Sequence, residues 1–158
     1  MPTHAEQKRL PFTQQQLFDL VADVDRYQDF LPWCVASRVN SRKDNVIHAD
    51  LVIGFKMFRE KFTSEVTLKA PDRIDVKYAH GPFKYLNNHW QFIPDEDGAH
   101  TTIDFYVDFE FRSRLLQTLI GAVFNEAVQR MVRAFEKRAH QIYGGEAPEG
   151  AAPSKGAA

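Results

Sequence analysis

Three polar side chains that can bind a ligand interrupt the apolar positions of two predicted strands. Glu60 and Ser64 share one face of segment 58–68, and Asn88 lies on the apolar face of segment 84–93. A buried polar group without a partner costs on the order of 1–3 kcal/mol, so these groups either pair with one another or meet a polar ligand atom. A few convergent polar groups in an apolar pocket are the usual composition of a small-molecule site.

No catalytic or metal-binding arrangement emerges from the sequence. The six His residues lack the spacing of known metal motifs, and no glycine-rich phosphate loop follows a strand. Asp104, Asp108 and Glu110 share a strand face that would suit acid–base chemistry, but we interpret it as a solvated outer face. Cys34 follows Trp33 without an obvious base, which predicts a packed thiol rather than a nucleophile. We therefore expect a binding protein with no catalytic residues and no metal site, not an enzyme.

Composition limits the class of protein further. A chain of 158 residues, 44% hydrophobic and 26% charged, fits one globular domain, and its single Cys excludes an internal disulfide. A formal charge of −1 gives no reason to expect generic nucleic-acid binding, and no DNA partner is predicted. The first residues carry no apolar core of a signal peptide, and no apolar run approaches the roughly 20 residues of a membrane span. We expect a cytoplasmic location.

Strand-like segments must position the polar groups. Residues 3–11 read as a polar edge strand, and apolar residues at alternate positions predict further strands over 47–55, 58–68, 73–79, 84–93 and 101–111. Turn residues separate these segments, and the connections are too short for crossover helices. The sequence therefore predicts an antiparallel meander with one face covered.

Two helices are predicted on either side of this run of strands. Thr13 and Gln16 have capping-box spacing, which predicts a short helix over 14–24. The segment Arg114 to about Tyr143 has apolar residues at three-and-four spacing and must be the helix that covers the sheet. Its polar face carries a candidate contact for an anionic partner, formed by Arg130, Arg133, Lys137 and Arg138.

The interior of such a fold is expected to be incompletely filled. A strongly curved sheet rich in aromatic residues, 13 of them Phe, leaves space when only one long and one short helix close it. Close packing makes such a void expensive unless something occupies it. Residues 145–158, rich in Ala, Gly and Pro, are predicted to form a disordered tail after a domain of residues 1–144.

Four segments together carry a resemblance to a known family. They are Tyr-x-x-Phe-Leu-Pro-Trp-Cys (27–34), Phe-Thr-Ser-Glu-Val-Thr-Leu (62–68), Gly-Pro-Phe-Lys-Tyr-Leu (81–86) and Asp-Phe-Glu-Phe-Arg-Ser-Arg-Leu-Leu (108–116). Their order resembles the coenzyme Q-binding START-domain family, which also contains the bacterial ribosome association toxin and sits in the wider polyketide cyclase-like superfamily. The resemblance covers about residues 3–143.

The resemblance implies an α+β helix-grip fold, in which a curved antiparallel sheet of about six to seven strands wraps around a long C-terminal helix. One or two short helices follow the first strand. It implies ubiquinone, or a related polyprenyl lipid, bound in a hydrophobic tunnel by a non-catalytic carrier that supports respiratory electron transport, with peripheral contact at the inner face of the respiratory membrane. It also admits an alternative, binding to the large ribosomal subunit to inhibit subunit joining.

The residues expected to contact the ligand lie on the apolar faces of the strands and of the last helix. They are Leu51, Ile53, Glu60, Phe62, Ser64, Val66, Asn88, Trp90, Phe92, Phe105, Val107, Val128, Met131 and Phe135. Leu31, Pro32 and Trp33 are expected at an entrance that touches the membrane surface, because an aromatic residue beside Pro suits an interface. An enzyme of the cyclase kind would need an acid or base in the tunnel, and only Glu60 is placed for that role.

Overall fold

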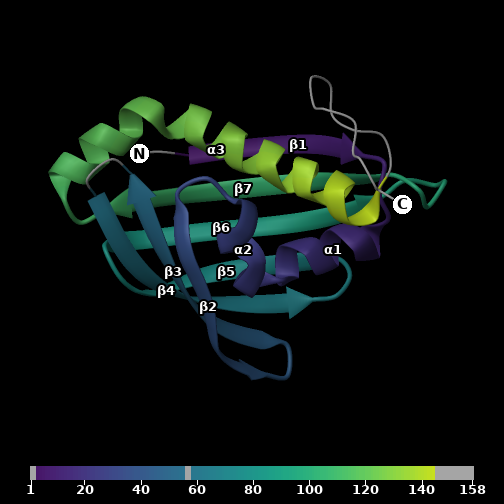
Figure 1. The fold of residues 1–158 in the computed structure, drawn as a ribbon, viewed down its shortest axis with the longest axis horizontal. Coiled ribbons are helices and arrows are strands. Elements are labelled where there is room, and N and C mark those ends of the chain that lie inside the picture. Colours follow the sequence, from purple (N-terminus) through teal and green to yellow (C-terminus); the bar gives the residue numbers. More distant parts are fainter. Residues whose placement is uncertain (1–2, 56–57, 145–158) are drawn as a thin grey trace.

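The computed structural model describes residues 3–55 and 58–144 (Figure 1). In this part of the chain seven strands form one antiparallel sheet in the order β1-β7-β6-β5-β4-β3-β2. The strands are β1 (Thr3–Leu10), β2 (Cys34–Lys43), β3 (Val46–Phe55), β4 (Phe58–Lys69), β5 (Arg73–His80), β6 (Phe83–Pro94) and β7 (Thr101–Phe111). The predicted meander and its one covered face are therefore confirmed.

The first strand lies at one edge of the sheet, beside the last. Consecutive strands from β2 to β7 pair with each other, while β1 pairs with β7 from Thr3↔Asp108 to Leu10↔Thr101, so β1 and β2 are the two edges. The β5–β6 turn requires glycine, because Gly81 has a φ of 143° and an added Cβ would lie 2.6 Å from Cβ of Phe62. This close approach joins the turn to β4, beside the predicted ligand site.

The first helix begins at the predicted capping box. In α1 (Gln14–Ala22) the Thr13 hydroxyl accepts from the Gln16 amide at 3.1 Å, and the Gln16 side chain accepts from the Thr13 amide at 2.9 Å. A 3₁₀ turn (Val24–Arg26) and the short α2 (Tyr27–Phe30) follow. Pro32 restricts only the residue before it, so this one helical turn fits upstream of the proline.

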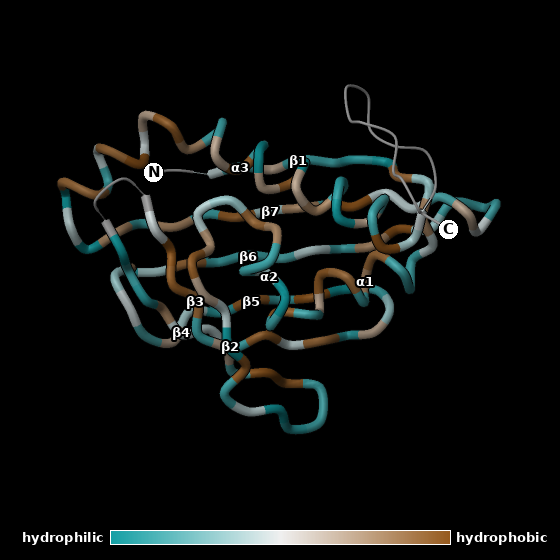
Figure 2. The backbone as a smooth tube through the Cα atoms, viewed as in Figure 1, coloured by the Kyte–Doolittle hydropathy of each residue, from teal (hydrophilic) through white to brown (hydrophobic). Residues whose placement is uncertain are grey.

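The long helix α3 (Arg114–Tyr143) crosses the inner face of the sheet (Figure 1). The face of α3 toward the sheet is buried, as the predicted helical stripe requires; its buried residues include Phe124, Val128, Val132, Phe135 and Ala139. Figure 2 shows that hydrophobic residues are denser in the first half of α3 than in the second. The helix therefore presents an apolar wall to the middle of the sheet.

The ends of α3 depart from the predicted stripe. Leu115 is 62% exposed and Ile142 is 49% exposed, so neither belongs to the buried face of the helix. His140 falls on the polar face by the helical period but is only 8% exposed, and its ring packs edge-on against Phe12 at 4.8 Å. Among the described helices, none is long and apolar enough to cross a membrane. The predicted tail, 145–158, lies outside the described residues.

Candidate functional site

An apolar cavity of about 280 Å³ lies between the inner face of the sheet and α3. Its floor comes from strands β3 to β7, its roof from α3, and one end from the segment between α1 and β2. Strand alternation sends one set of side chains into this space and the other set to solvent. The unfilled interior expected from the sequence is therefore present.

The cavity brings most of the predicted ligand contacts together. Its lining includes Leu51, Ile53, Phe62, Ser64, Val66, Asn88, Trp90, Phe105, Val107, Val128, Met131 and Phe135. The predicted entrance residues Leu31, Pro32 and Trp33 line it as well. Their contact with a ligand stays a prediction.

Two predicted contacts lie outside the lining. Phe92 is only 2% exposed and packs edge-on against Phe18 of α1 at 5.9 Å, so it belongs to solid core. Glu60 is half-buried in β4 beside Ile53 of β3 and is not among the lining residues. The alternation placed both residues on the correct face, but the position of the helices along the strands decides which of them meets the cavity.

The prediction missed other lining residues of two kinds. The first kind shared the same periodic signal as the predicted contacts: Ile74, Val76, Phe83, Leu86, Phe109, Phe111, Ile120, Val123, Phe124 and Ala127. The second kind, Val24, Tyr27 and Cys34, comes from the irregular segment before β2, where no periodic signal exists. Only the packing of that segment over the cavity reveals them.

The polar groups of the lining differ in whether they have partners. Asn88 accepts from Trp90 Nε1 at 3.2 Å and donates to the Tyr106 carbonyl at 2.8 Å, so its amide is held by the protein. Ser64 is 2% exposed, and its hydroxyl has no side-chain hydrogen bond within the described residues. Ser64 is therefore the lining group whose hydroxyl is free to form a hydrogen bond with a ligand.

An aromatic cluster closes the cavity toward α1 and α2. The Tyr27 hydroxyl donates to the Val21 carbonyl, and burial raises the pKa of this phenol far above its ordinary value. The Tyr27 ring packs edge-on against Phe135 at 5.3 Å, and Phe135 packs against Trp90 at 4.9 Å. These contacts fix the wall, and Tyr27 stays neutral at physiological pH.

The segment at the predicted entrance is held in an unusual backbone conformation. Trp33 has a φ of 64°, and its carbonyl accepts from the Gly54 amide of β3 at 2.8 Å. Gly54 has no room for a side chain, because an added Cβ would lie 2.7 Å from Cγ2 of Val35. Beside it, burial raises the pKa of the Cys34 thiol, which keeps the thiol protonated at neutral pH.

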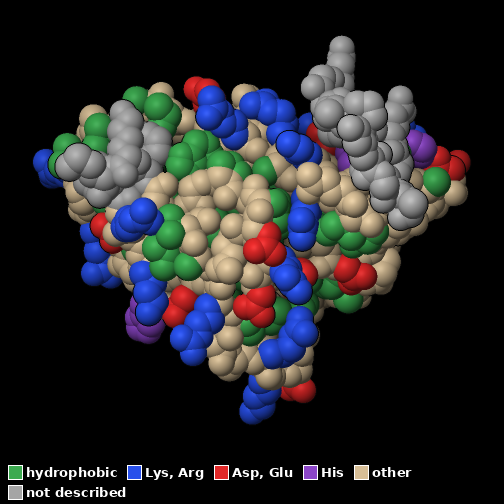
Figure 3. Space-filling view, viewed as in Figure 1, with side chains coloured by type: hydrophobic (Ala, Val, Ile, Leu, Met, Phe, Trp, Pro, Cys, Tyr) green, Lys and Arg blue, Asp and Glu red, His purple; other side chains and the backbone are tan. Residues whose placement is uncertain are grey.

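The basic face of α3 is only partly free. Figure 3 shows several Lys and Arg side chains over this helix. Arg130 donates to Glu126 at 2.9 Å, and the Arg138 guanidinium lies 5.3 Å from the centre of the Phe30 ring. Arg133 and Lys137 are exposed. Within residues 3–55 and 58–144, no cluster of His, Cys, Asp and Glu could hold a metal ion.

Comparison with known proteins identifies relatives of two kinds. Residues 10–136 match the family described as polyketide cyclase/dehydrase and lipid transport. The chain is 41% identical over 139 residues to the ribosome association toxin RatA of Rickettsia prowazekii, covering 85% of this chain and 94% of that protein. It is 40% identical over 144 residues to the mitochondrial coenzyme Q-binding protein COQ10 homolog B of Xenopus laevis, covering 89% of this chain and 59% of that protein.

Solved structures share the fold. An 18 kDa protein from Caulobacter crescentus is 40% identical, with a TM-score of 0.73 over 92% of this chain and 100% of that one. The Zhui aromatase/cyclase of a Streptomyces species superposes with a TM-score of 0.79 over 92% of this chain and 99% of that chain. At 15% identity, this second likeness concerns the fold alone.

Proposed function

The chain belongs to the polyketide cyclase/dehydrase and lipid transport family, and we propose that it binds ubiquinone or a related polyprenyl lipid beneath α3. The observation that carries this proposal is the apolar cavity with the buried, unpartnered Ser64 hydroxyl in its lining. The coenzyme Q-binding relative supports the choice of ligand, although the chain spans only 59% of that relative's length. Residues 1–144 would form the lipid-binding domain.

The cavity suits the ring and the first isoprene units of such a lipid. Its volume of about 280 Å³ lies at the lower end of small-molecule pockets, which span roughly 300–1,000 Å³. A quinone carbonyl beside Ser64 would accept the hydroxyl that the protein leaves unpartnered. The rest of a longer prenyl tail would leave past Leu31 and Trp33, where peripheral contact with the respiratory membrane would deliver or receive it.

Burial of the prenyl tail supplies enough free energy for carrying. An isoprene unit has five carbons, so at about 0.8 kcal/mol per buried carbon each unit contributes roughly 4 kcal/mol. Three units contribute about 12 kcal/mol, which leaves the roughly 8 kcal/mol of micromolar affinity after an association cost of about 4 kcal/mol, the lower end of its range. Release to a membrane stays possible at such an affinity, which is what a carrier needs.

The lining does not favour chemistry on the ligand. Among the described residues, no acidic side chain and no His lines the cavity, and the pKa values of Tyr27 and Cys34 are raised. Glu60, the acid that a cyclase-like mechanism would need, lies outside the lining. We propose a non-catalytic quinone carrier.

Mass spectrometry of lipids that copurify with the protein from a quinone-producing host tests this function. We expect extractable ubiquinone or a related polyprenyl lipid, and exchange with added quinone. Protein that carries no quinone and does not bind added quinone would refute the proposal. Replacing Glu60 with Gln should leave binding unchanged, because its side chain does not line the cavity.

A second candidate function is binding to the large ribosomal subunit, which the 41% identity to a ribosome association toxin favours. On this chain the free cations of α3, Arg133 and Lys137, would form the contact. Cosedimentation with large subunits should then fall steeply with salt, because each phosphate contact releases counterions. Arg133→Glu should weaken it further, and absence from ribosomal fractions at low salt would remove this candidate.

A further inference from the structure

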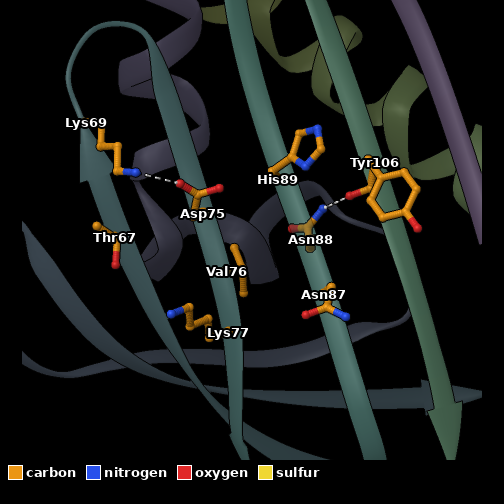
Figure 4. Close-up of a pocket in the computed structure, with 9 residues that line it drawn as sticks. All are labelled: Thr67, Lys69, Asp75, Val76, Lys77, Asn87, Asn88, His89 and Tyr106. Carbon is orange, nitrogen blue, oxygen red and sulfur yellow. Dashed lines mark hydrogen bonds and ion pairs between the residues drawn. The ribbon is translucent and has the colours of Figure 1, made fainter.

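A second pocket lies on the outer face of the sheet, away from α3. It is a shallow, open depression of about 410 Å³ across strands β4 to β7 (Figure 4). Apart from Val76, its lining residues are polar, charged or aromatic, in contrast to the apolar cavity on the inner face. The two pockets are separated by the thickness of the sheet.

One side of the outer pocket is a preformed aromatic stack. His89 of β6 and Tyr106 of β7 are opposite each other in the register, and their rings stack 5.4 Å apart at 18°. The Tyr106 hydroxyl donates to the Asp108 carboxylate, which holds its ring in place. Both rings line the pocket (Figure 4). A stacked pair of this kind offers a further planar group a surface on which to stack without sequence preference.

The opposite side of the outer pocket carries three cations near the Asp75 carboxylate. Asp75 accepts from Arg73 Nε at 2.9 Å and pairs with Lys69 Nζ at 3.3 Å, so two cations surround one carboxylate. Lys77 is exposed and forms no ion pair within the described residues, while its cross-strand neighbour Glu65 is paired with His48. This free ammonium is suited to a phosphate.

A single row of side chains connects the two sides. Thr67, Asp75, His89 and Tyr106 are successive cross-strand neighbours on β4, β5, β6 and β7. At about 4.8 Å per strand the row spans roughly 14 Å, the scale of one nucleotide with its phosphate. Lys69 and Lys77 flank this row on opposite sides. The Thr67 hydroxyl and the Asp75 carboxylate continue the row from the rings, where the edge of a base needs hydrogen-bonding partners.

We propose that the outer pocket binds a nucleotide of single-stranded RNA. The base stacks on the His89 and Tyr106 pair, and the phosphate lies beside the Lys77 ammonium. This site is separate from the lipid cavity and does not depend on it. A free nucleotide presents the same base and phosphate, so the test must distinguish the two sources.

Fluorescence anisotropy with a labelled single-stranded RNA of about ten nucleotides measures this binding at low salt. We expect His89→Ala to weaken binding roughly tenfold, because stacking on the ring is lost, and His89→Phe to retain it. Lys77→Gln should lower affinity and reduce the salt slope by about one. Lys43→Gln is the control, because it removes an exposed charge from the distant β2–β3 turn. It should change the affinity at fixed salt by no more than about twofold and should leave the RNA length preference unchanged.

Four outcomes overturn the proposal. They are no RNA binding by the wild-type protein, equal binding by His89→Ala, loss of binding with Arg133→Gln instead, and binding of AMP as tight as that of RNA. Urea midpoints of His89→Ala and His89→Phe show that both variants fold. Quinone binding should be unchanged in every variant, so failure of this site and failure of the lipid proposal are read separately.

Discussion

Enlarging one side chain of α3 tests whether the cavity is a real void that a ligand fills. Val128 and Val132 are the same residue type, lie one helical turn apart and are 7% and 4% exposed. Val128 lines the cavity, whereas Val132 is buried in the core and is not among the lining residues. Val128→Phe and Val132→Phe therefore add the same atoms to two different environments.

The expected changes in stability differ in size. Phe has four more side-chain carbons than Val, which would contribute up to about 3 kcal/mol if all were buried without strain. At Val128 these carbons enter empty space, so we expect the free energy of unfolding to rise or to change by less than about 1 kcal/mol. At Val132 they enter close-packed core, where overpacking costs about 1–3 kcal/mol.

The expected changes in ligand affinity have the opposite pattern. Four carbons at Val128 displace most of one isoprene unit, a loss of about 3 kcal/mol or roughly a hundredfold in Kd. Val132→Phe should bind the ligand within about threefold of the wild-type affinity as long as it is folded, because it does not contact the cavity.

Both quantities are measurable with the native chromophores. Trp33 and Trp90 are the two tryptophans of the chain, and both line the cavity. Quenching of their fluorescence during titration with a short-chain ubiquinone gives the Kd, and urea unfolding gives the stability. Equal destabilisation by the two variants would mean that no void exists at Val128, and wild-type quinone binding by Val128→Phe would mean that the ligand lies elsewhere.

Three further predictions concern single polar groups of the lining. Ser64→Ala should weaken quinone binding by about 0.5–1.5 kcal/mol without lowering stability, measured by the same titration; an unchanged Kd would mean that the ligand does not meet the hydroxyl. Cys34 should react with iodoacetamide only as pH rises above the ordinary thiol pKa, and more slowly with quinone bound. Because the pKa of Cys34 is raised in the folded state, its stabilising contribution is complete below the unfolded-state pKa and is lost as pH rises through the folded-state pKa. Fast labelling at neutral pH would contradict this prediction. Tyr27→Phe should lower the free energy of unfolding by about 1–3 kcal/mol, because the Val21 carbonyl loses its donor, and unchanged urea unfolding would show that the hydrogen bond contributes nothing.

The architecture was predictable because its signals are local. Alternation over 58–68 and 101–111 reports which side chains share a face, and the capping box at Thr13 reports where a helix begins. The burial of His140 was not predictable in the same way. By the helical period, His140 falls on the polar face of α3. Its burial is explained only by its packing against Phe12, which belongs to a segment more than a hundred residues away.

The candidate site was predictable as a face but not as a location along that face. Trp90 and Phe92 are two residues apart on the same side of β6, yet only Trp90 lines the cavity. Phe92 lies under Phe18 of α1, and no sequence pattern specifies where a helix crosses a strand. The hydrogen bond from the Asn88 amide to the Tyr106 carbonyl likewise depends on the register between β6 and β7.

Strand β6 shows how one sheet can serve two unlike ligands. Asn88 and Trp90 point into the apolar cavity, and His89 between them lies in the outer pocket with Tyr106. Because adjacent residues of a strand face opposite sides, a lipid and an RNA nucleotide can bind opposite faces of the same strand, although Val76 and Asn88 line both pockets. Lipid binding and RNA binding are then not mutually exclusive for this fold, and substitutions confined to one face separate them.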